Sequence, residues 1–399
     1  MCAEIVKGPP VRAILGACRN SPVLPPRVGS PSYSPALKQR VNPGRDAGPV
    51  LRKGWPARLT STASPPINET VMTSRFAIIR DTTPAAAAIP KGSVVAMGNF
   101  DGVHLGHRAV IAAALRMSRA RGKPAFAVTF EPHPRKFFSP NTPQFRLTDE
   151  TNKLRLLAGT GLAGAVVMTF DAARAGTTAQ DFIHHDLIDR LGISGIAVGY
   201  DFHFGKGRVG SPSLLASEAT RFGIEVDVQP HIDIDERPVS SSAIRMALAE
   251  GQIADATAML GGPWFVTGEV IHGDKRGAGL GYPTANIRLD KDCGLRHGVY
   301  AVRVGRGQGK DQRRFDGVAS FGRRPTFDNG APLLEVFLFD FKGDLYGTTL
   351  DVAFIGFIRE ELKFDSVETL VRRMDSDADI ARAILAAAPD AFPKLGEIG

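Results

Sequence analysis

The chain carries the stretch Gly98-Asn99-Phe100-Asp101-Gly102-Val103-His104-Leu105-Gly106-His107, and this stretch decides the fold of its first half. A short apolar strand over Ser93–Met97 precedes it, and a helix over Leu105–Arg121 follows it. The free N–H groups at the start of a helix, together with the helix dipole, attract phosphate. The stretch therefore predicts a phosphate-binding turn between a strand and a helix.

Two histidines give this turn its chemistry. His104 and His107 are three residues apart, so they lie on one face of the first helical turn. Their imidazoles can donate hydrogen bonds to phosphate oxygens as negative charge builds up there. Gly106 leaves room where a phosphate must approach. The alternative is two ordinary surface histidines at a helix cap, but the preceding strand and Gly-Asn-Phe-Asp-Gly favour adenylyl transfer from ATP.

The first half beyond this turn alternates strands and helices. Helical spacing places three apolar residues of the first helix on one face, namely Val110, Ala114 and Met117. Further strands are predicted over Pro124–Phe130, Ala165–Phe170, Ile196–Asp201 and Ile224–Gln229, and further helices over Gln180–Leu191 and Ser213–Phe222. Such alternation indicates a Rossmann-like α/β domain, in which a parallel sheet binds ligands outside the carboxyl ends of its strands.

The pattern changes near Gly261-Gly262-Pro263. Short β-like runs separated by Gly-rich turns follow, over Trp264–Ile271, Gly298–Val304, Arg314–Ser320, Leu333–Phe339 and Leu350–Phe357. This pattern predicts a small antiparallel β-barrel or sandwich. A C-terminal helix over Ser366–Ala387 completes it.

Residues 1–71 differ from the rest in composition. They hold 10 of the 49 Lys and Arg residues, 3 of the 41 acids and 12 of the 28 prolines. Their composition is typical of a disordered segment. A transit peptide is another interpretation. We favour a leader with a mis-assigned start, because Met72 opens an ordinary N-terminal sequence.

Charge and cysteine content exclude several classes of partner. Nearly all of the net charge of +8 lies in the leader, since residues 72–399 hold 39 basic and 38 acidic residues. A broad nucleic-acid-binding face is therefore not expected. No apolar run reaches the ~18 residues of a membrane span. Three widely spaced cysteines (Cys2, Cys18 and Cys293) form no metal pattern and fit a reducing cytoplasm.

Three further segments narrow the function. They are Thr129–Pro134 (Thr-Phe-Glu-Pro-His-Pro), Val198–Gly210 and Ser240–Arg245 (Ser-Ser-Ser-Ala-Ile-Arg), all expected at the carboxyl edge of the sheet. With the His-x-Gly-His turn, the first half resembles the nucleotidylyltransferase superfamily. More closely, it resembles the adenylyltransferase module of bacterial bifunctional riboflavin kinase/FAD synthetases.

The resemblance implies roles for individual residues in adenylyl transfer. His104, His107 and Arg245 would be catalytic, and Phe130 and Asp201 would contact flavin. The residues expected to bind ATP and its phosphates are Gly98, Asn99, Phe100, Asp101, Gly106, Ser241 and Ser242. Simpler interpretations stay open: Ser240–Ser242 as a helix N-cap, Phe130 as a core aromatic and Asp201 as a turn residue.

A second site is predicted in the barrel-like half. The segment Gly273–Asn286 is rich in glycine, which lets backbone N–H groups surround a phosphate. Thr284 and Asn286 face the same side of an extended strand and offer hard oxygen donors suited to Mg²⁺. The expected phosphate-binding residues are Gly273, Lys275, Arg276 and Gly281. Gly273–Gly279 alone would read as a flexible basic hairpin.

The segment Pro283-Thr284-Ala285-Asn286 favours a phosphate site over a flexible hairpin, because it resembles the riboflavin kinase motif. By this resemblance Glu335 is the general base that takes a proton from the ribityl hydroxyl, which attacks the γ-phosphate of ATP. Four positions depart from the family pattern: Ala278, Tyr282, Ser320-Phe321-Gly322 and Phe337. The departures concern flavin affinity and loop behaviour rather than the type of reaction.

The sequence thus predicts two-step synthesis of flavin cofactors, with riboflavin, FMN and ATP as partners and no nucleic acid or membrane. The predicted segments are a leader over 1–71, an FMN adenylyltransferase domain over 72–255 and a riboflavin kinase domain over 256–395. A tRNA-charging or tRNA-binding protein is disfavoured by the near-neutral charge. A catalytically silent flavin-binding or regulatory protein is disfavoured because His104, His107, Thr284, Asn286 and Glu335 are all present. The oligomeric state stays open.

Overall fold

The computed structural model describes residues 75–82, 89–273, 281–307, 309–323 and 332–398. All of these residues belong to one compact unit of the chain. The predicted leader over 1–71 lies outside the described residues.

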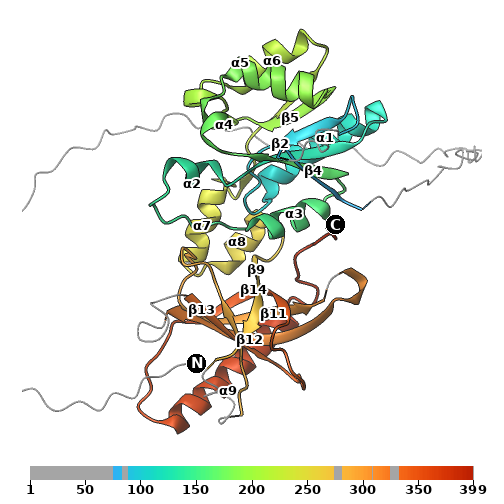
Figure 1. Cartoon of the computed structure of the whole chain (residues 1–399). Helices are drawn as coiled ribbons and strands as arrows, with labels where there is room; N and C mark the ends of the chain where they lie inside the picture. Colours follow the sequence, from blue (N-terminus) through green and yellow to red (C-terminus); the bar gives the residue numbers. More distant parts are fainter. Residues whose placement is uncertain (1–74, 83–88, 274–280, 308, 324–331, 399) are drawn as a thin grey trace, which may run out of the picture. The chain divides into compact units, whose positions relative to one another are not determined.

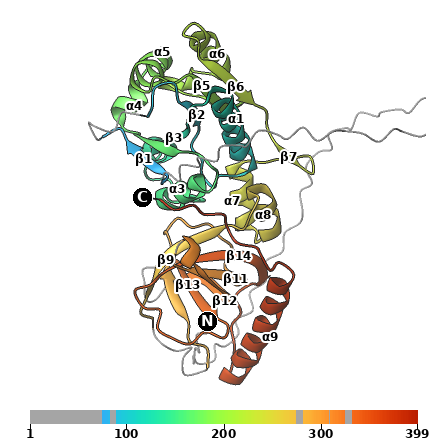
Figure 2. The ribbon, with the colours of Figure 1, turned by 90° about the vertical axis from the view of Figure 1, so that its right-hand side faces the viewer.

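The first half forms a six-stranded parallel sheet in the order β1-β4-β3-β2-β5-β6 (Figures 1 and 2). The strands are β1 (Ala77–Arg80), β2 (Val94–Met97), β3 (Ala125–Glu131), β4 (Gly164–Thr169), β5 (Gly195–Gly199) and β6 (Glu225–Gln229). The predicted α/β fold is therefore confirmed: β2 to β6 have ends within two residues of the expectation, and β1 was not predicted.

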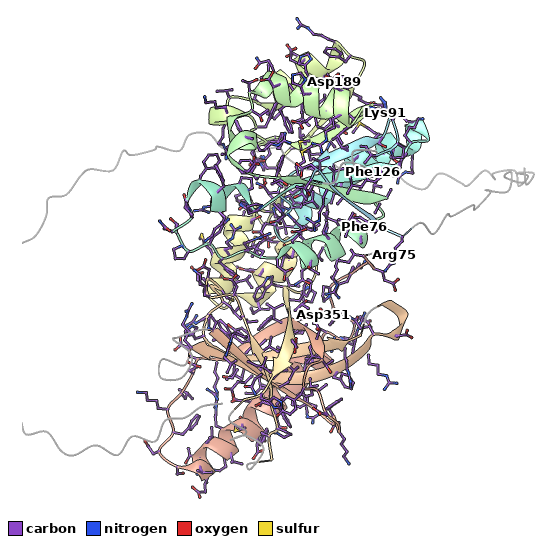
Figure 3. The ribbon with its side chains drawn as sticks, in the orientation of Figure 1. Arg75, Phe76, Lys91, Phe126, Asp189 and Asp351 are labelled. Carbon is purple, nitrogen blue, oxygen red and sulfur yellow. The ribbon has the colours of Figure 1, made fainter. Side chains whose placement is uncertain are left out.

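Both faces of this sheet are covered, because successive side chains of a strand point to opposite sides. Val94 and Ala96 of β2 pack in one core with helix α1 (Leu105–Arg121). Val95 and Met97 pack in a second core together with Phe126 of β3, which is labelled in Figure 3. The predicted apolar stripe of α1 is confirmed, since Val110, Ala114 and Met117 are buried.

The chain turns back at β2. It moves outward from β2 to β3 and β4, and then returns to place β5 on the other side of β2. A reversal of this kind opens a crevice at the carboxyl ends of the central strands, where ligands bind in open α/β sheets. The Gly98–His107 turn leaves β2 at that point.

The helices differ from the sequence expectation in several places, and the helices Pro134–Phe138, Ala172–Gly176 and Ile253–Leu260 were not predicted at all. The predicted helix over Gln180–Leu191 is a short helix α5 (Ala179–Asp181) followed by a π-helix over Phe182–Arg190, although Ile183 and Leu187 are buried as expected. Helix α3 (Glu150–Ala158) was not predicted, because its buried residues include Lys153 and Arg155 and leave no clear apolar stripe. The remaining elements of this half are α2 (Pro134–Phe138), α4 (Ala172–Gly176), the 3-10 turn Lys206–Arg208, α6 (Pro212–Thr220), β7 (Asp233–Ile234), β8 (Arg237–Pro238), α7 (Ser241–Ala249) and α8 (Ile253–Leu260).

The second half is a closed antiparallel barrel in the order β10-β13-β12-β11-β14-β9, and β9 pairs with β10 to close it. The strands are β9 (Phe265–Ile271), β10 (Ala285–Arg288), β11 (Gly298–Arg306), β12 (Arg313–Arg323), β13 (Pro332–Leu338) and β14 (Thr349–Arg359), with a 3-10 turn at Gly309–Asp311. Helix α9 (Val367–Ala386) packs on β11, β12 and β14 (Figures 1 and 2). The barrel and its terminal helix are confirmed.

No helix among the described residues is long and apolar enough to span a bilayer.

Candidate active sites

The turn after β2 has an unusual backbone. Phe100 and Val103 have positive φ angles of 52° and 43°, and Gly102 has a φ of 84°. A non-glycine residue in this region costs free energy and persists only where its surroundings fix it. The side chains of Phe100 and Val103 supply that fixation, because both are fully buried. The turn is therefore held in one shape before any ligand binds.

Asp101 fastens the turn to two other segments. Its buried carboxylate accepts from the backbone N–H of Thr148 at 3.0 Å and from the guanidinium of Arg245. Its carbonyl accepts from the hydroxyl of Ser241 at 3.0 Å, and Arg245 also donates to the carbonyl of Phe145 at 2.6 Å. Two residues from the start of α7 are thus brought to the turn, as the sequence predicted.

His104 is the N-cap of α1. Its Nδ1 accepts from the backbone N–H of His107 at 3.4 Å, so the proton of the neutral ring resides on Nε2. The rings of His104 and His107 stack with centroids 3.7 Å apart. Nδ1 of His107 is buried and has no hydrogen-bond partner among the described residues. The structure therefore brings the two predicted histidines together at the start of the helix.

Both rings are neutral near pH 7. Burial lowers the pKa of His104 to about 4, and Asp101 only partly offsets this effect. Burial also lowers the pKa of His107 well below its usual value, and His104 and Lys153 lower it further. A neutral imidazole still donates one hydrogen bond, so the pair can act on phosphate oxygens without carrying a fixed charge.

We expect the chain to lose stability as the pH falls from 6.5 to about 4, because an unfolded His104 binds a proton in this window and a folded one does not. His104 alone should lower the free energy of unfolding by at most about 3 kcal/mol over this window. Urea unfolding at about pH 7 and about pH 4.5 measures this loss. His104→Gln should reduce the pH dependence, and an unchanged dependence would contradict the expectation.

Gly106 has a local role besides leaving room for phosphate. A Cβ at this position would lie 3.1 Å from Cε1 and 3.2 Å from Nδ1 of His104. Contacts this close would press on the ring that caps the helix. The glycine therefore also permits the placement of His104.

The other predicted residues of this site fall into two groups. Asn99, Ser242 and Asp201 are exposed. Phe100 is fully buried, and Phe130 is 8% exposed within a core cluster that includes Phe182. The structure therefore favours the core-aromatic alternative for Phe130, and it leaves Phe100 only its backbone to offer to a ligand.

The sequence reasoning missed a charged group beneath the turn. Glu131 at the end of β3 accepts from Arg146 at 2.6 Å and from Lys153 at 2.6 Å. His133 follows, and its Nδ1 accepts from the backbone N–H of Arg135 at 3.1 Å, which leaves Nε2–H as the donor. No sequence signal marked Lys153, because α3 has no clear apolar stripe.

The barrel brings the second set of predicted residues together through strand register. Asn286 of β10 lies directly opposite Glu335 of β13. Directly opposite residues have Cβ atoms about 5 Å apart. The neighbours Ala285, Leu334 and Val336 point into the barrel interior, so Asn286 and Glu335 share the outer face. Both are nonetheless buried, at 5% and 9% exposure.

Thr284 and Tyr282 extend this face. The amide of Asn286 donates to the carbonyl of Thr284 at 3.4 Å. The ring of Tyr282 lies 4.8 Å from that of Phe337, and its hydroxyl donates to Asp375 of α9. Burial raises the pKa of Tyr282 to about 12, and the Asp375 hydrogen bond adds to the effect. Two departures from the family pattern, Tyr282 and Phe337, thus contact each other.

The glycine-rich segment is described only in part. Lys275, Arg276 and Ala278 lie outside the described residues. Gly281 has a φ of 83°, which favours glycine, and Gly273 lies against Asn286.

Family models and relatives agree with both halves. A FAD synthetase family model matches residues 86–243, and a riboflavin kinase family model matches residues 260–385. The bifunctional riboflavin kinase/FMN adenylyltransferase of Haemophilus influenzae is 37% identical over 75% of this chain and 96% of its own length. The Escherichia coli K12 protein of the same name is 37% identical over 76% of this chain and 96% of its own length.

The chain belongs to the bifunctional riboflavin kinase/FMN adenylyltransferase family. In this chain the FAD synthetase domain comes first and the riboflavin kinase domain second. The enzyme phosphorylates riboflavin to FMN and joins FMN to the AMP moiety of a second ATP, which releases pyrophosphate. The prediction of a bifunctional enzyme that uses riboflavin, FMN and ATP is confirmed.

One solved structure matches this chain over about the same share of its length as these relatives do. It is a Streptococcus pneumoniae protein described as a macrolide-efflux protein, which matches with a TM-score of 0.69 and 30% identity over 76% of this chain and 98% of its own. The similarity shows that the two chains share a fold.

Proposed function

We propose that the Gly98–His107 turn carries adenylyl transfer. In this reaction a phosphate oxygen of FMN bonds to the α-phosphorus of ATP while the bond to the leaving pyrophosphate breaks. His104 donates to a phosphate oxygen through Nε2–H, and the ring of His107 stacks against His104 at the N-terminus of α1. The observation that supports this role is a stacked pair of neutral imidazoles, His104 buried and His107 partly buried, at a helix N-terminus at the switch point of the sheet.

Arg245 and the start of α7 complete this proposed site. The bonds to Asp101 and Phe145 hold the guanidinium beside the turn, where its charge stabilises the phosphates of ATP. The polar contacts to phosphate would come from Gly98, Asn99, Ser241 and Ser242. Asp201, exposed after β5, is the proposed flavin contact, and Phe130 supports the site from the core.

We propose that Glu335 is the general base of the kinase reaction. It accepts the proton of the ribityl hydroxyl as that oxygen bonds to the γ-phosphorus of ATP and ADP leaves. The observation that supports this role is the register that places a buried carboxylate opposite Asn286 on the outer face of the barrel. Gly273, Gly281, Lys275 and Arg276 are the proposed contacts to the phosphates of ATP.

Mg²⁺ is the proposed metal of this second site. Thr284 and Asn286 offer a hydroxyl and an amide oxygen, which are hard donors, and no cluster of three or more His, Cys, Asp or Glu residues suited to a metal exists among the described residues. This donor set suits Mg²⁺, which proteins often bind through only one or two side chains while substrate phosphates supply further ligands. When bound, the ion would neutralise charge on the phosphates of ATP.

We predict that Gly273→Ala lowers riboflavin phosphorylation. A Cβ on Gly273 would lie 2.3 Å from Nδ2 of Asn286, so the amide must move. Displacement of a metal ligand or its support typically costs about 10–100-fold in affinity or activity. The Mg²⁺ concentration for half-maximal rate should rise while FAD formation from supplied FMN is unchanged.

Gly262→Ala is the matched control, because a Cβ there meets nothing within 4 Å. Both activities should persist in this variant. A normal Mg²⁺ dependence in Gly273→Ala would contradict the role proposed for Asn286.

We also propose the cytoplasm as the compartment in which the enzyme works, and segment bounds of 72–255 and 256–395. ATP is abundant there, and the free, buried Cys293 fits a reducing environment. The matches over 86–243 and 260–385 fall inside the two proposed segments.

A further inference from the structure

Lys153 of α3 is the most deeply buried charged side chain near the adenylyl site. It is 1% exposed, whereas lysine is almost never fully buried unless it is paired. Its ammonium donates to Glu131 at 2.6 Å, to the hydroxyl of Thr129 at 3.0 Å and to the carbonyl of Asn99 at 3.5 Å. All three acceptors belong to β3 or to the phosphate turn.

Stability alone does not explain this arrangement. Removing two charges from water costs several kcal/mol per ion, and apolar side chains of similar volume often serve as well. The carboxylate is ionised, because Lys153 and Arg146 outweigh the opposing effect of burial and hold the pKa of Glu131 below its ordinary value. A charged pair kept at such cost indicates a role besides packing.

Thr129 transmits this contact to the turn. It is fully buried, so it cannot touch a substrate, and its hydroxyl donates to the carbonyl of Asn99 at 3.2 Å while accepting from Lys153. Asn99 lies between β2 and His104, the N-cap of α1. The buried ammonium therefore fixes the near end of the turn, and Asp101 fixes its middle.

We propose that Lys153 is a positioning residue for adenylyl transfer, which acts on the phosphate turn through Thr129 and the carbonyl of Asn99. The inference rests on the role proposed above for the Gly98–His107 turn. A buried cation close to His107 also favours the negative charge that develops on the transferred phosphate, since a site of low dielectric strengthens charge interactions. The influence of Lys153 on the pKa of His107 reflects that proximity.

The test uses the full chain and four variants: Lys153→Met, Lys153→Arg, Thr129→Val and Thr129→Ser. A misplaced catalytic turn costs about a hundredfold in rate. We expect Lys153→Met and Thr129→Val to lower kcat of FMN adenylylation by about this factor, with KM for FMN changed by less than about threefold. Thr129→Ser keeps the hydroxyl and should retain most of the rate, and Lys153→Arg should retain part of it.

Two measurements distinguish positioning from simple unfolding. Riboflavin phosphorylation in the same sample reports on the barrel, and thermal unfolding reports on the chain as a whole. The double variant Lys153→Met/Glu131→Gln removes both charges and leaves no unpaired carboxylate. If it folds and its adenylylation rate is normal, the proposal is wrong.

Coupling between the two side chains provides a sharper readout. Lys153→Met and Thr129→Val act on one contact, so the double variant should lose little more rate than either single variant. Fully multiplicative losses would overturn the proposed path through Thr129. A different result would show that the role proposed for the Gly98–His107 turn is wrong. In that case His107→Ala would keep its adenylylation rate, whatever the effect of Lys153→Met.

Discussion

Replacing Glu335 by glutamine is expected to abolish FMN formation and to leave FAD formation from supplied FMN intact. Glutamine has nearly the shape of glutamate but accepts no proton from the ribityl hydroxyl. General base catalysis contributes about 10²–10⁴-fold, so the kinase kcat should fall within this range. Chromatography of the flavins formed from riboflavin and MgATP, with a parallel assay on FMN, measures both activities.

The geometry of the barrel makes this substitution informative. Glu335 is 9% exposed and lies opposite Asn286, so a neutral side chain of the same size removes a buried charge without opening a cavity. Glu269→Gln on strand β9, which pairs with β10 and not with β13, is the control, because Glu269 is exposed. Kinase activity should survive this control. Loss of both activities in folded Glu335→Gln protein would refute two independent sites.

His107→Ala is expected to have the converse effect. It removes the ring that stacks on His104 at 3.7 Å and contacts Phe100 at 5.3 Å. Loss of one donor to a developing charge costs about 10²–10³-fold in kcat, so FAD formation should fall by this factor. Riboflavin phosphorylation in the same sample should be unchanged.

A matched histidine and a milder variant control for structural damage. His185 lies on the π-helix with its side chain 73% exposed, so His185→Ala should retain both activities. His107→Asn keeps a polar donor and should lose less than His107→Ala. Wild-type FAD formation in a folded His107→Ala variant would contradict the proposed role of the turn.

Much of the fold follows from the sequence because its signals are local. The helix over Leu105–Arg121 has the bounds predicted from the glycine-rich turn before it and its apolar stripe. The barrel strands follow from β-like runs between Gly-rich turns, although β10 is only four residues long and was implied only by the spacing of Thr284 and Asn286. The π-helix over Phe182–Arg190 was not predictable, because its apolar residues fit an ordinary helix equally well.

The sequence by itself determined the family, the two reactions and the residues that we expect to carry them. The His-x-Gly-His turn, the Ser-Ser-Ser-Ala-Ile-Arg segment and Pro-Thr-Ala-Asn are short motifs whose composition matches their expected ligands. They predict a phosphate turn, a helix start and a metal-binding strand. They also distinguished two reactions on one chain, because the motifs occur in order in two regions of different periodicity.

Only the tertiary structure decided how these residues are held and charged. Burial makes His104 and His107 neutral, strand register places Asn286 against Glu335, and Phe130 becomes part of the core. Lys153 is 54 residues from Asn99 in the chain, yet its ammonium reaches that carbonyl. Burial and long-range contacts arise when distant segments pack together, so a local pattern in the sequence does not contain them.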